Sequence, residues 1–299
     1  MDRTSYTNLA KSWEYVEDHA FSRQSTDLNA IRTHAEEAGI PQGSAAQAEL
    51  LRMLVHMVNA TSVIAVGTGS VVETLQLVNG LDNSGQLTAV DSSSQGIALI
   101  RTLFNRLSDE TQTTLRAVNA PVDVFLPRLN AENYDLIVVA GDAENYGASF
   151  EQAPRLLKKH GVIVFTDILA FDSATSAGGV LNPANRDAKS IAMRGLLETV
   201  ESDERFVTAL TPTGTGFARG RQALEHAVPN GLPFPHTKSR HSRISDECRL
   251  LLCLAYGAEC HTPERRYLTF GCVSIIWLTT TVPSSRTDST SPAASSSAV

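Results

Sequence analysis

The sequence predicts an α/β fold with a doubly wound, Rossmann-like, mostly parallel sheet of seven strands. Short apolar runs alternate with helix-compatible segments of ordinary length from about residue 62 to residue 220. Such alternation is typical of a parallel sheet covered by helices. The first apolar run ends in a glycine turn and the second ends in an acid, as expected where a parallel sheet binds a nucleotide. An N-terminal helical cap precedes the sheet, and a largely irregular C-terminal tail follows it.

The individual elements follow from hydrophobic periodicity and from turn residues. Apolar residues recur at helical spacing in 28–40 and 45–58, which predicts the two helices of the cap. Strands are expected over 62–66, 86–90, 115–120, 134–142, 161–167, 205–212 and 214–220, the last two as an antiparallel pair. Helices are expected between them over 71–78, 92–107, 151–160 and 187–200, the second with serine N-caps.

The composition limits which binding partners and which cellular compartment are expected for the protein. The 299 residues carry a formal net charge of −7 and 42% hydrophobic residues. An acidic chain is poorly suited to binding nucleic acid or anionic lipid, and a small neutral or cationic partner fits better. No basic start with an apolar core marks the N-terminus, and no window reaches the roughly 20 apolar residues that span a bilayer. We therefore expect a cytoplasmic protein without a membrane segment.

The chain divides into two kinds of sequence near Arg221. All four cysteines lie late, between Cys248 and Cys272, so the earlier part has no thiol and suits a reducing compartment. Residues 1–221 are expected to form one domain, and residues 222–299 an atypical extension without sustained periodicity. The cysteine spacing lacks the paired halves of a zinc site, and the Ser-rich end is expected to be disordered.

The glycine turn and the following acid indicate an adenosine-containing cofactor. Glycines at 67 and 69 let the backbone approach a ligand closely, and Asp91, 24 residues after Gly67, is placed to accept both ribose hydroxyls. The pattern fits a nicotinamide enzyme almost as well, although GTGSVV lacks the third glycine of the dinucleotide fingerprint.

Four segments, VIAVGTGSVVETLQL, LTAVD, YDLIVVAGDAENY and LLKKHGVIVFTDIL, occur in an order and spacing that resemble a known family. The chain is similar to bacterial class I S-adenosylmethionine-dependent O-methyltransferases related to catechol and caffeoyl-CoA O-methyltransferases. The resemblance begins near IPQGSAAQAELL and covers about residues 26–221. It favours S-adenosylmethionine over a nicotinamide as the cofactor.

The resemblance also implies a set of cofactor-binding residues. By it, the glycine turn lines the methionine portion, Asp91 binds the ribose, and two residues after the third strand lie near adenine. Ser44 and Gln47 would close the pocket from the cap, although an N-cap and a solvated helix face explain them equally well. The expected cofactor-binding residues are Ser44, Gly67, Thr68, Gly69, Asp91, Asn119 and Ala120.

The sequence departs from the family where metal-dependent members place their ligands. Ala140, Ala143 and Ile168 stand where those members have an acid, a lysine and an amide. A hard cation needs several converging oxygen ligands, so no metal is expected. Asp142 and Asp167 are the candidate catalytic residues, to orient or deprotonate an acceptor, and the alternative is that each acid only caps the next turn.

We therefore expect methyl transfer from S-adenosylmethionine to an oxygen nucleophile of a small molecule, without a metal. The missing acid, lysine and amide motivate one alternative, a catalytically inactive S-adenosylmethionine-binding protein that senses or binds a partner. A nicotinamide oxidoreductase is the third candidate. A homodimer is left open. Trp13 and Tyr15 either cover the acceptor pocket or anchor the N-terminal segment.

Overall fold

A computed structural model describes residues 3–67, 70–171, 178–213, 217–222 and 277–278. Contacts divide the chain into one unit of residues 1–225 and 272–299 and another of residues 226–271. All described residues belong to the first unit. Of the predicted extension 222–299, only Gln222, Trp277 and Leu278 are described. The cysteines and the predicted disorder of the tail therefore lie outside the described residues.

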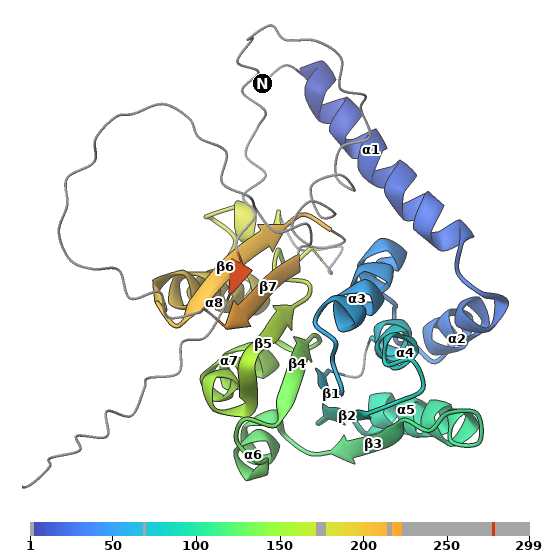
Figure 1. Ribbon diagram of the computed structural model, residues 1–299. Helices are drawn as coiled ribbons and strands as arrows, with labels where there is room; N and C mark the ends of the chain where they lie inside the picture. Colours follow the sequence, from blue (N-terminus) through green and yellow to red (C-terminus); the bar gives the residue numbers. More distant parts are fainter. Residues whose placement is uncertain (1–2, 68–69, 172–177, 214–216, 223–276, 279–299) are drawn as a thin grey trace, which may run out of the picture. The chain divides into compact units, whose positions relative to one another are not determined.

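Helices and strands alternate along the described chain (Figure 1). The helices are α1 (Arg3–Ser22), α2 (Thr26–Glu37), α3 (Ala45–Met57), α4 (Val71–Gly80), α5 (Ser94–Leu107), α6 (Val122–Phe125), α7 (Ala143–Leu156) and α8 (Ala188–Ser202), with short 3-10 turns at Leu126–Arg128 and Gly179–Leu181. The strands are β1 (Ser62–Val66), β2 (Gln86–Asp91), β3 (Thr114–Asn119), β4 (Tyr134–Val139), β5 (Leu157–Phe165), β6 (Phe206–Thr211), β7 (Phe217–Gln222) and β8 (Trp277–Leu278).

Five strands form the parallel part of the sheet, in the order β3-β2-β1-β4-β5. The predicted α/β class and parallel sheet are confirmed for these strands. Beyond them, β7 pairs antiparallel with β5 and with β6, and β8 pairs parallel with β7. The predicted total of seven strands stays a prediction. Because strand order reverses between β1 and β4, the crevice for a ligand is expected beyond the carboxyl ends of these strands.

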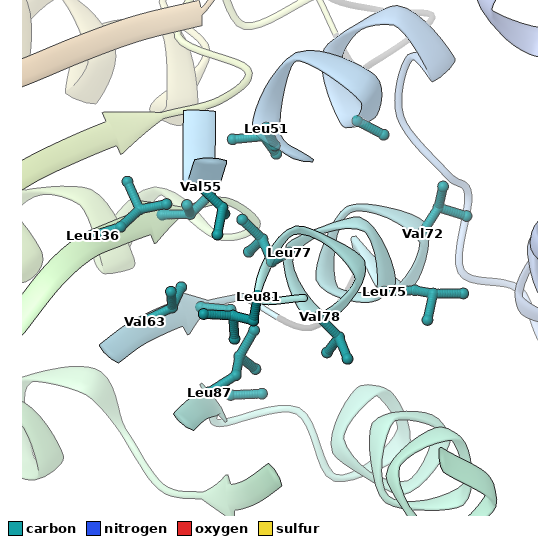
Figure 2. Close-up of a cluster of buried hydrophobic side chains, with 14 of the residues drawn as sticks. Leu51, Val55, Val63, Val72, Leu75, Leu77, Val78, Leu81, Leu87 and Leu136 are labelled. Carbon is teal, nitrogen blue, oxygen red and sulfur yellow. The ribbon is translucent and has the colours of Figure 1, made fainter. Parts of the chain in front are cut away.

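Alternate residues of the parallel strands enter two separate cores. Val63, Leu87 and Leu136 pack with α3, α4 and α5 on one face of the sheet (Figure 2). Their neighbours Ile64 and Ile137 pack with α6, α7 and α8 on the other face. Because side chains alternate along a strand, buried strands covered on both sides read as continuous apolar runs. This is the doubly wound arrangement that the sequence predicts.

Two helices differ from the sequence-based expectation. The helix expected over 151–160 is α7, which begins at Ala143 and ends at Leu156, and Leu157–His160 already belong to β5. The expected C-terminal boundary is wrong: α7 includes Pro154 but ends at Leu156, and His160, which was expected in the helix, adopts a left-handed φ of 68° ahead of Gly161. The helix α1 was not anticipated, because its largely exposed residues carry no clear apolar stripe.

Candidate active site

The glycine turn after β1 is packed against backbone at the carboxyl edge of the sheet. Gly67 has a φ of +84°, and its N–H donates to the carbonyl of Val90 over 3.0 Å. A Cβ at this position would lie 2.2 Å from the carbonyl oxygen of Ala140. Only glycine fits such a close approach of two backbones. The other predicted members of the turn, Thr68 and Gly69, lie outside the described residues.

Asp91 ends β2 beside this turn, and its side chain is only 5% exposed. Its Oδ1 accepts a hydrogen bond of 3.0 Å from the backbone N–H of Ser93, which begins the turn into α5. The side chain of Asn119 donates to the carbonyls of Asp91 and Ser92, and the Ala120 N–H also donates to the Asp91 carbonyl. The structure thus brings together three of the predicted cofactor-binding residues at the ends of β2 and β3.

Ser44 is the N-cap of α3, where its Oγ accepts a 3.1 Å hydrogen bond from the N–H of Gln47. The Ser44 hydroxyl also donates to Glu17 of α1, and the same carboxylate accepts from the N–H groups of Ala45 and Ala46. A carboxylate at a helix N-terminus satisfies otherwise unpaired donors and complements the helix dipole. Ser44 has the capping role weighed from the sequence, and its cofactor role stays a prediction.

The two candidate catalytic acids follow β4 and β5, at the same edge of the sheet. Asp142 is exposed and is the N-cap residue of α7, without a side-chain capping hydrogen bond. Asp167 is half-buried and adopts a φ of +55°, in the left-handed region that is costly for residues other than glycine. Strained backbone of this kind concentrates at functional sites.

Asn145 and Tyr146, the pair after Asp142, have structural roles. Asn145 Nδ2 donates to the carbonyl of Ala140 over 3.1 Å, which helps to fix the backbone that faces Gly67. The Tyr146 hydroxyl donates to the carbonyl of Thr166, and its ring is fully buried against Phe165. The burial of Tyr146 and its hydrogen bond to Thr166 are those of a structural residue.

A further acid, Glu73, lies in the first turn of α4, directly after the glycine turn. Its side chain is 3% exposed, and Oε1 accepts a hydrogen bond of 2.5 Å from Gln47 Nε2. Burial, followed by the negative charge of Asp167, raises the pKa of Glu73 from 4.5 to about 7. Glu73 is not among the residues predicted from the sequence. The available signal was a carboxylate inside the apolar segment VVETLQLV.

Comparisons with known proteins agree with this arrangement. A family model described as O-methyltransferase matches residues 20–223. A Mycobacterium marinum protein assigned as an O-methyltransferase is 30% identical over 205 residues, which cover 68% of this chain and 88% of that protein.

The chain belongs to the O-methyltransferase family.

Solved structures share its fold. A Corynebacterium glutamicum protein, 25% identical, superposes with a TM-score of 0.61 and covers 73% of this chain and 100% of its own. An O-methyltransferase from Bacillus cereus, solved in complex with SAH, is 19% identical with a TM-score of 0.60, and covers 71% of this chain and 99% of its own.

Family membership confirms the predicted enzyme class, an O-methyltransferase with S-adenosylmethionine as methyl donor. The inactive binding protein and the nicotinamide enzyme are not favoured. In this O-methyltransferase, Ala140 and Ile168 are buried and present no oxygen ligand from their side chains. Within the described ranges, no group of three or more His, Cys, Asp or Glu residues is placed to hold a metal ion. Among the described helices, none is long and apolar enough to cross a membrane.

Proposed function

We propose that the carboxyl edge of β1, β2 and β4 binds S-adenosylmethionine, and that the enzyme methylates an oxygen nucleophile of a small molecule without a metal ion. The observation that carries the proposal is the pairing of buried Asp91 with the Gly67 turn. Asp91 offers a carboxylate for ribose hydroxyls, and Gly67 leaves room beside the Ala140 carbonyl that any Cβ would occupy. Asn119 and Ala120 would flank the adenine.

The bound cofactor supplies an electrophilic methyl group, so the protein has to align an acceptor oxygen, remove its proton and exclude water. Positioning alone can account for much of such a rate enhancement. We assign acceptor orientation or deprotonation to Asp167 and Asp142. Asp167 is the stronger candidate, because it is half-buried and held in a strained conformation, whereas Asp142 is exposed.

Metal independence rests on the residues at the family's metal positions. Ala140 and Ile168 cannot donate side-chain oxygens, and Asp167 alone does not provide the several ligands that a hard cation requires. EDTA should therefore leave methyl transfer unchanged. Activity that vanishes with chelator and returns with Mg²⁺ would contradict metal independence.

A cavity of about 380 Å³ between α1, the start of α3 and the end of β6 is the candidate acceptor pocket. Trp13 lines it together with Ser44 and Pro212. Tyr15 is 70% exposed and stacks on His19, so of the two N-terminal aromatic residues only Trp13 lines this cavity. An aromatic wall suits a flat acceptor.

Titration calorimetry with S-adenosylmethionine tests the cofactor site. Asp91→Ala should weaken binding by about 1.5–3 kcal/mol, the usual size of a hydrogen bond to a charged group. Asp82→Asn is the matched control, because this acid is 78% exposed and follows the far end of α4. An unchanged dissociation constant for folded Asp91→Ala would remove the ribose assignment. Turnover on a panel of phenols, catechols and carboxylic acids then tests catalysis, and binding without turnover would favour the sensor.

Four further features complete the proposal. The catalytic domain spans residues 1–221, and its sheet consists of the five parallel strands with β6 and β7 as the sixth and seventh. The protein acts in the cytoplasm, and a homodimer is compatible with this assignment. Size-exclusion chromatography with light scattering measures the oligomeric state directly.

A further inference from the structure

Glu73 lies on α4, a helix that is buried on almost all sides. Nine of the ten residues of α4 are buried, among them the polar Glu73, Thr74 and Gln76. The carboxyl group of Glu73 points toward the start of α3, where Gln47 donates to Oε1. A Cβ on Gly43 would lie 3.3 Å from the same oxygen, so this glycine leaves space for the carboxyl group.

Two buried acceptor atoms at this place have no hydrogen-bond donor within the described part of the chain. They are Glu73 Oε2 and Gln47 Oε1. Leaving a buried acceptor unsatisfied costs about 1–3 kcal/mol, and native proteins contain few such atoms. Two neighbouring acceptors, one of them on an acid, suit a donor that carries several hydrogens and a positive charge.

The charges that face Glu73 favour a cation. Asp167, which follows β5, interacts unfavourably with the Glu73 carboxylate. Arg32 of α2 and the Ser70 hydroxyl lower the pKa of Glu73. The residue of α3 that bonds to Glu73 is the neutral Gln47, which also lowers this pKa. Arg32 Nη1 donates to the Gly43 carbonyl and the guanidinium lies over the Phe21 ring, while Nε and Nη2 are buried with no hydrogen-bond partner among the described residues. Burial is the largest cause of the shift, and together with Asp167 it raises the pKa of Glu73 to about 7.

The position of Glu73 relative to the strand ends gives the direction of a bound cofactor. Asp91 lies on the β2 side of the Gly67 turn. Asp167, whose charge interacts with Glu73, follows β5 on the other side of the turn. A ligand with its ribose at Asp91 that extends across Gly67 therefore directs its other end toward Glu73. In S-adenosylmethionine this end carries an α-ammonium group.

We propose that Glu73 and Gln47 accept hydrogen bonds from the α-ammonium group of the cofactor, so that Glu73 is a positioning residue that links cofactor affinity to pH. The proposal rests on the cofactor assignment at Asp91 and Gly67. Ionised Glu73 binds the ammonium group, and the ammonium group in turn lowers the pKa of Glu73. Affinity therefore rises as pH increases through about 7 and levels off above it.

Calorimetry with S-adenosylhomocysteine at pH 6, 7 and 8 tests this linkage, because the amine of this ligand stays protonated over the range. For the wild type, the dissociation constant should fall about tenfold from pH 6 to pH 8, as expected for one proton released near pH 7. Glu73→Gln should bind about tenfold more weakly at pH 8 and show a flat pH profile. Glu144→Gln, the same change in the exposed first turn of α7, should match the wild type.

A second ligand separates positioning from a structural role. 5′-Methylthioadenosine lacks the amino-acid portion, so its affinity should depend neither on pH nor on Glu73→Gln. Equal losses for both ligands, or a flat pH profile for the wild type, would overturn the proposal. If neither ligand binds the wild type, the cofactor assignment itself fails. Gln47→Met provides a second variant, for which the loss should again be confined to S-adenosylhomocysteine.

Discussion

Two acids at opposite edges of the same sheet, Asp135 and Glu73, differ in the hydrogen-bond donors that surround their carboxyl groups. At the amino edge, Asp135 Oδ2 accepts hydrogen bonds from the N–H groups of Thr61 and Ser62 and from Lys158 Nζ, all within 3.0 Å. At the carboxyl edge, the side-chain donors to Glu73 are the neutral Gln47, which bonds to Oε1, and the neutral Ser70 hydroxyl, and Oε2 has no hydrogen-bond partner among the described residues.

The pKa values of the two acids diverge accordingly. Burial raises the pKa of Asp135, but hydrogen bonds from Thr61 and Lys158 outweigh it and hold that pKa below its ordinary value. Burial raises the pKa of Glu73 to about 7, and Asp167 adds to the effect. A satisfied acid ties β1, β4 and β5 together, whereas an unsatisfied acid beside a glycine turn is typical of a binding site. The edges should therefore respond differently to substitution.

The largest effect is expected for Gly67→Ala at the carboxyl edge. The new Cβ would meet the Ala140 carbonyl oxygen at 2.2 Å, and the φ of +84° is unfavourable for alanine. We expect a loss of at least about 3 kcal/mol in the free energy of unfolding, measured by urea titration. Gly147→Ala is the control, because this helical glycine has open space around it and alanine there should stabilise by up to about 1 kcal/mol. Equal stability of both variants would contradict the packing described for the turn.

Asp135→Ala should cost about 3 kcal/mol, because it leaves two backbone N–H groups and Lys158 without their shared acceptor. Since the pKa of Asp135 is lowered in the folded state, its contribution is present above the ordinary aspartate pKa and disappears as pH falls through the folded value. The variant should therefore lose less stability on acidification than the wild type does. Cofactor affinity should stay unchanged, and a joint loss of affinity would show that the two edges are not independent.

Glu73 should make the free energy of unfolding fall as pH rises, which is opposite to the pH dependence from Asp135 and smaller than the loss expected for Asp135→Ala. Its raised pKa means that the folded state holds a proton which the unfolded state releases from about pH 4.5, so stability falls as pH rises toward about 7 and is level above it. The loss between pH 5 and pH 8 should be about 2 kcal/mol, following from 1.36 kcal/mol per pKa unit with a discount for solvent relaxation. Thermal unfolding of Glu73→Gln should lack this slope. A wild-type profile that is flat over the same range would mean that the pKa of Glu73 is not raised.

The two edges also differ in how many of their elements and functional residues could be predicted from the sequence. Strands β1 and β2 and helix α4 could be predicted, because Ser62–Val66 and Gln86–Asp91 are short apolar runs that end in a glycine turn and an acid. Asp91 and Gly67 could be proposed as cofactor-binding residues because they lie at the ends of those runs. Glu73 was not proposed, because its place within the apolar segment VVETLQLV indicates burial but does not show which groups of α2 and α3 lie beside it. The role of Glu17 as a cap of α3 likewise depends on a contact 27 residues away in sequence.

The smallest effect is expected for removal of the tail. A chain that ends at Gln222 keeps β7, which pairs with β5 over four residues and with β6 over six. It loses only the described pairing of β8, in which Arg219 lies opposite Trp277 and Gly220 opposite Leu278. Because two strands still flank β7, its position in the sheet does not depend on this two-residue contact. The family match also ends at residue 223.

We therefore expect the shortened chain to unfold within about 0.5 kcal/mol of the full chain, the usual range for changes away from a core. It should also bind S-adenosylmethionine with the same affinity. The shortened chain lacks the apolar, β-branched stretch CVSIIWLTTTV. It should therefore aggregate less on heating, as measured by light scattering. An insoluble or unfolded product, beside a sound full chain, would mean that the pairing of β8 with β7 contributes to folding and that the boundary at residue 221 cuts through the catalytic domain. A chain that lacks residues 223–271 but keeps β8 would then restore folding, because the contribution would come from the strand and not from the segment before it.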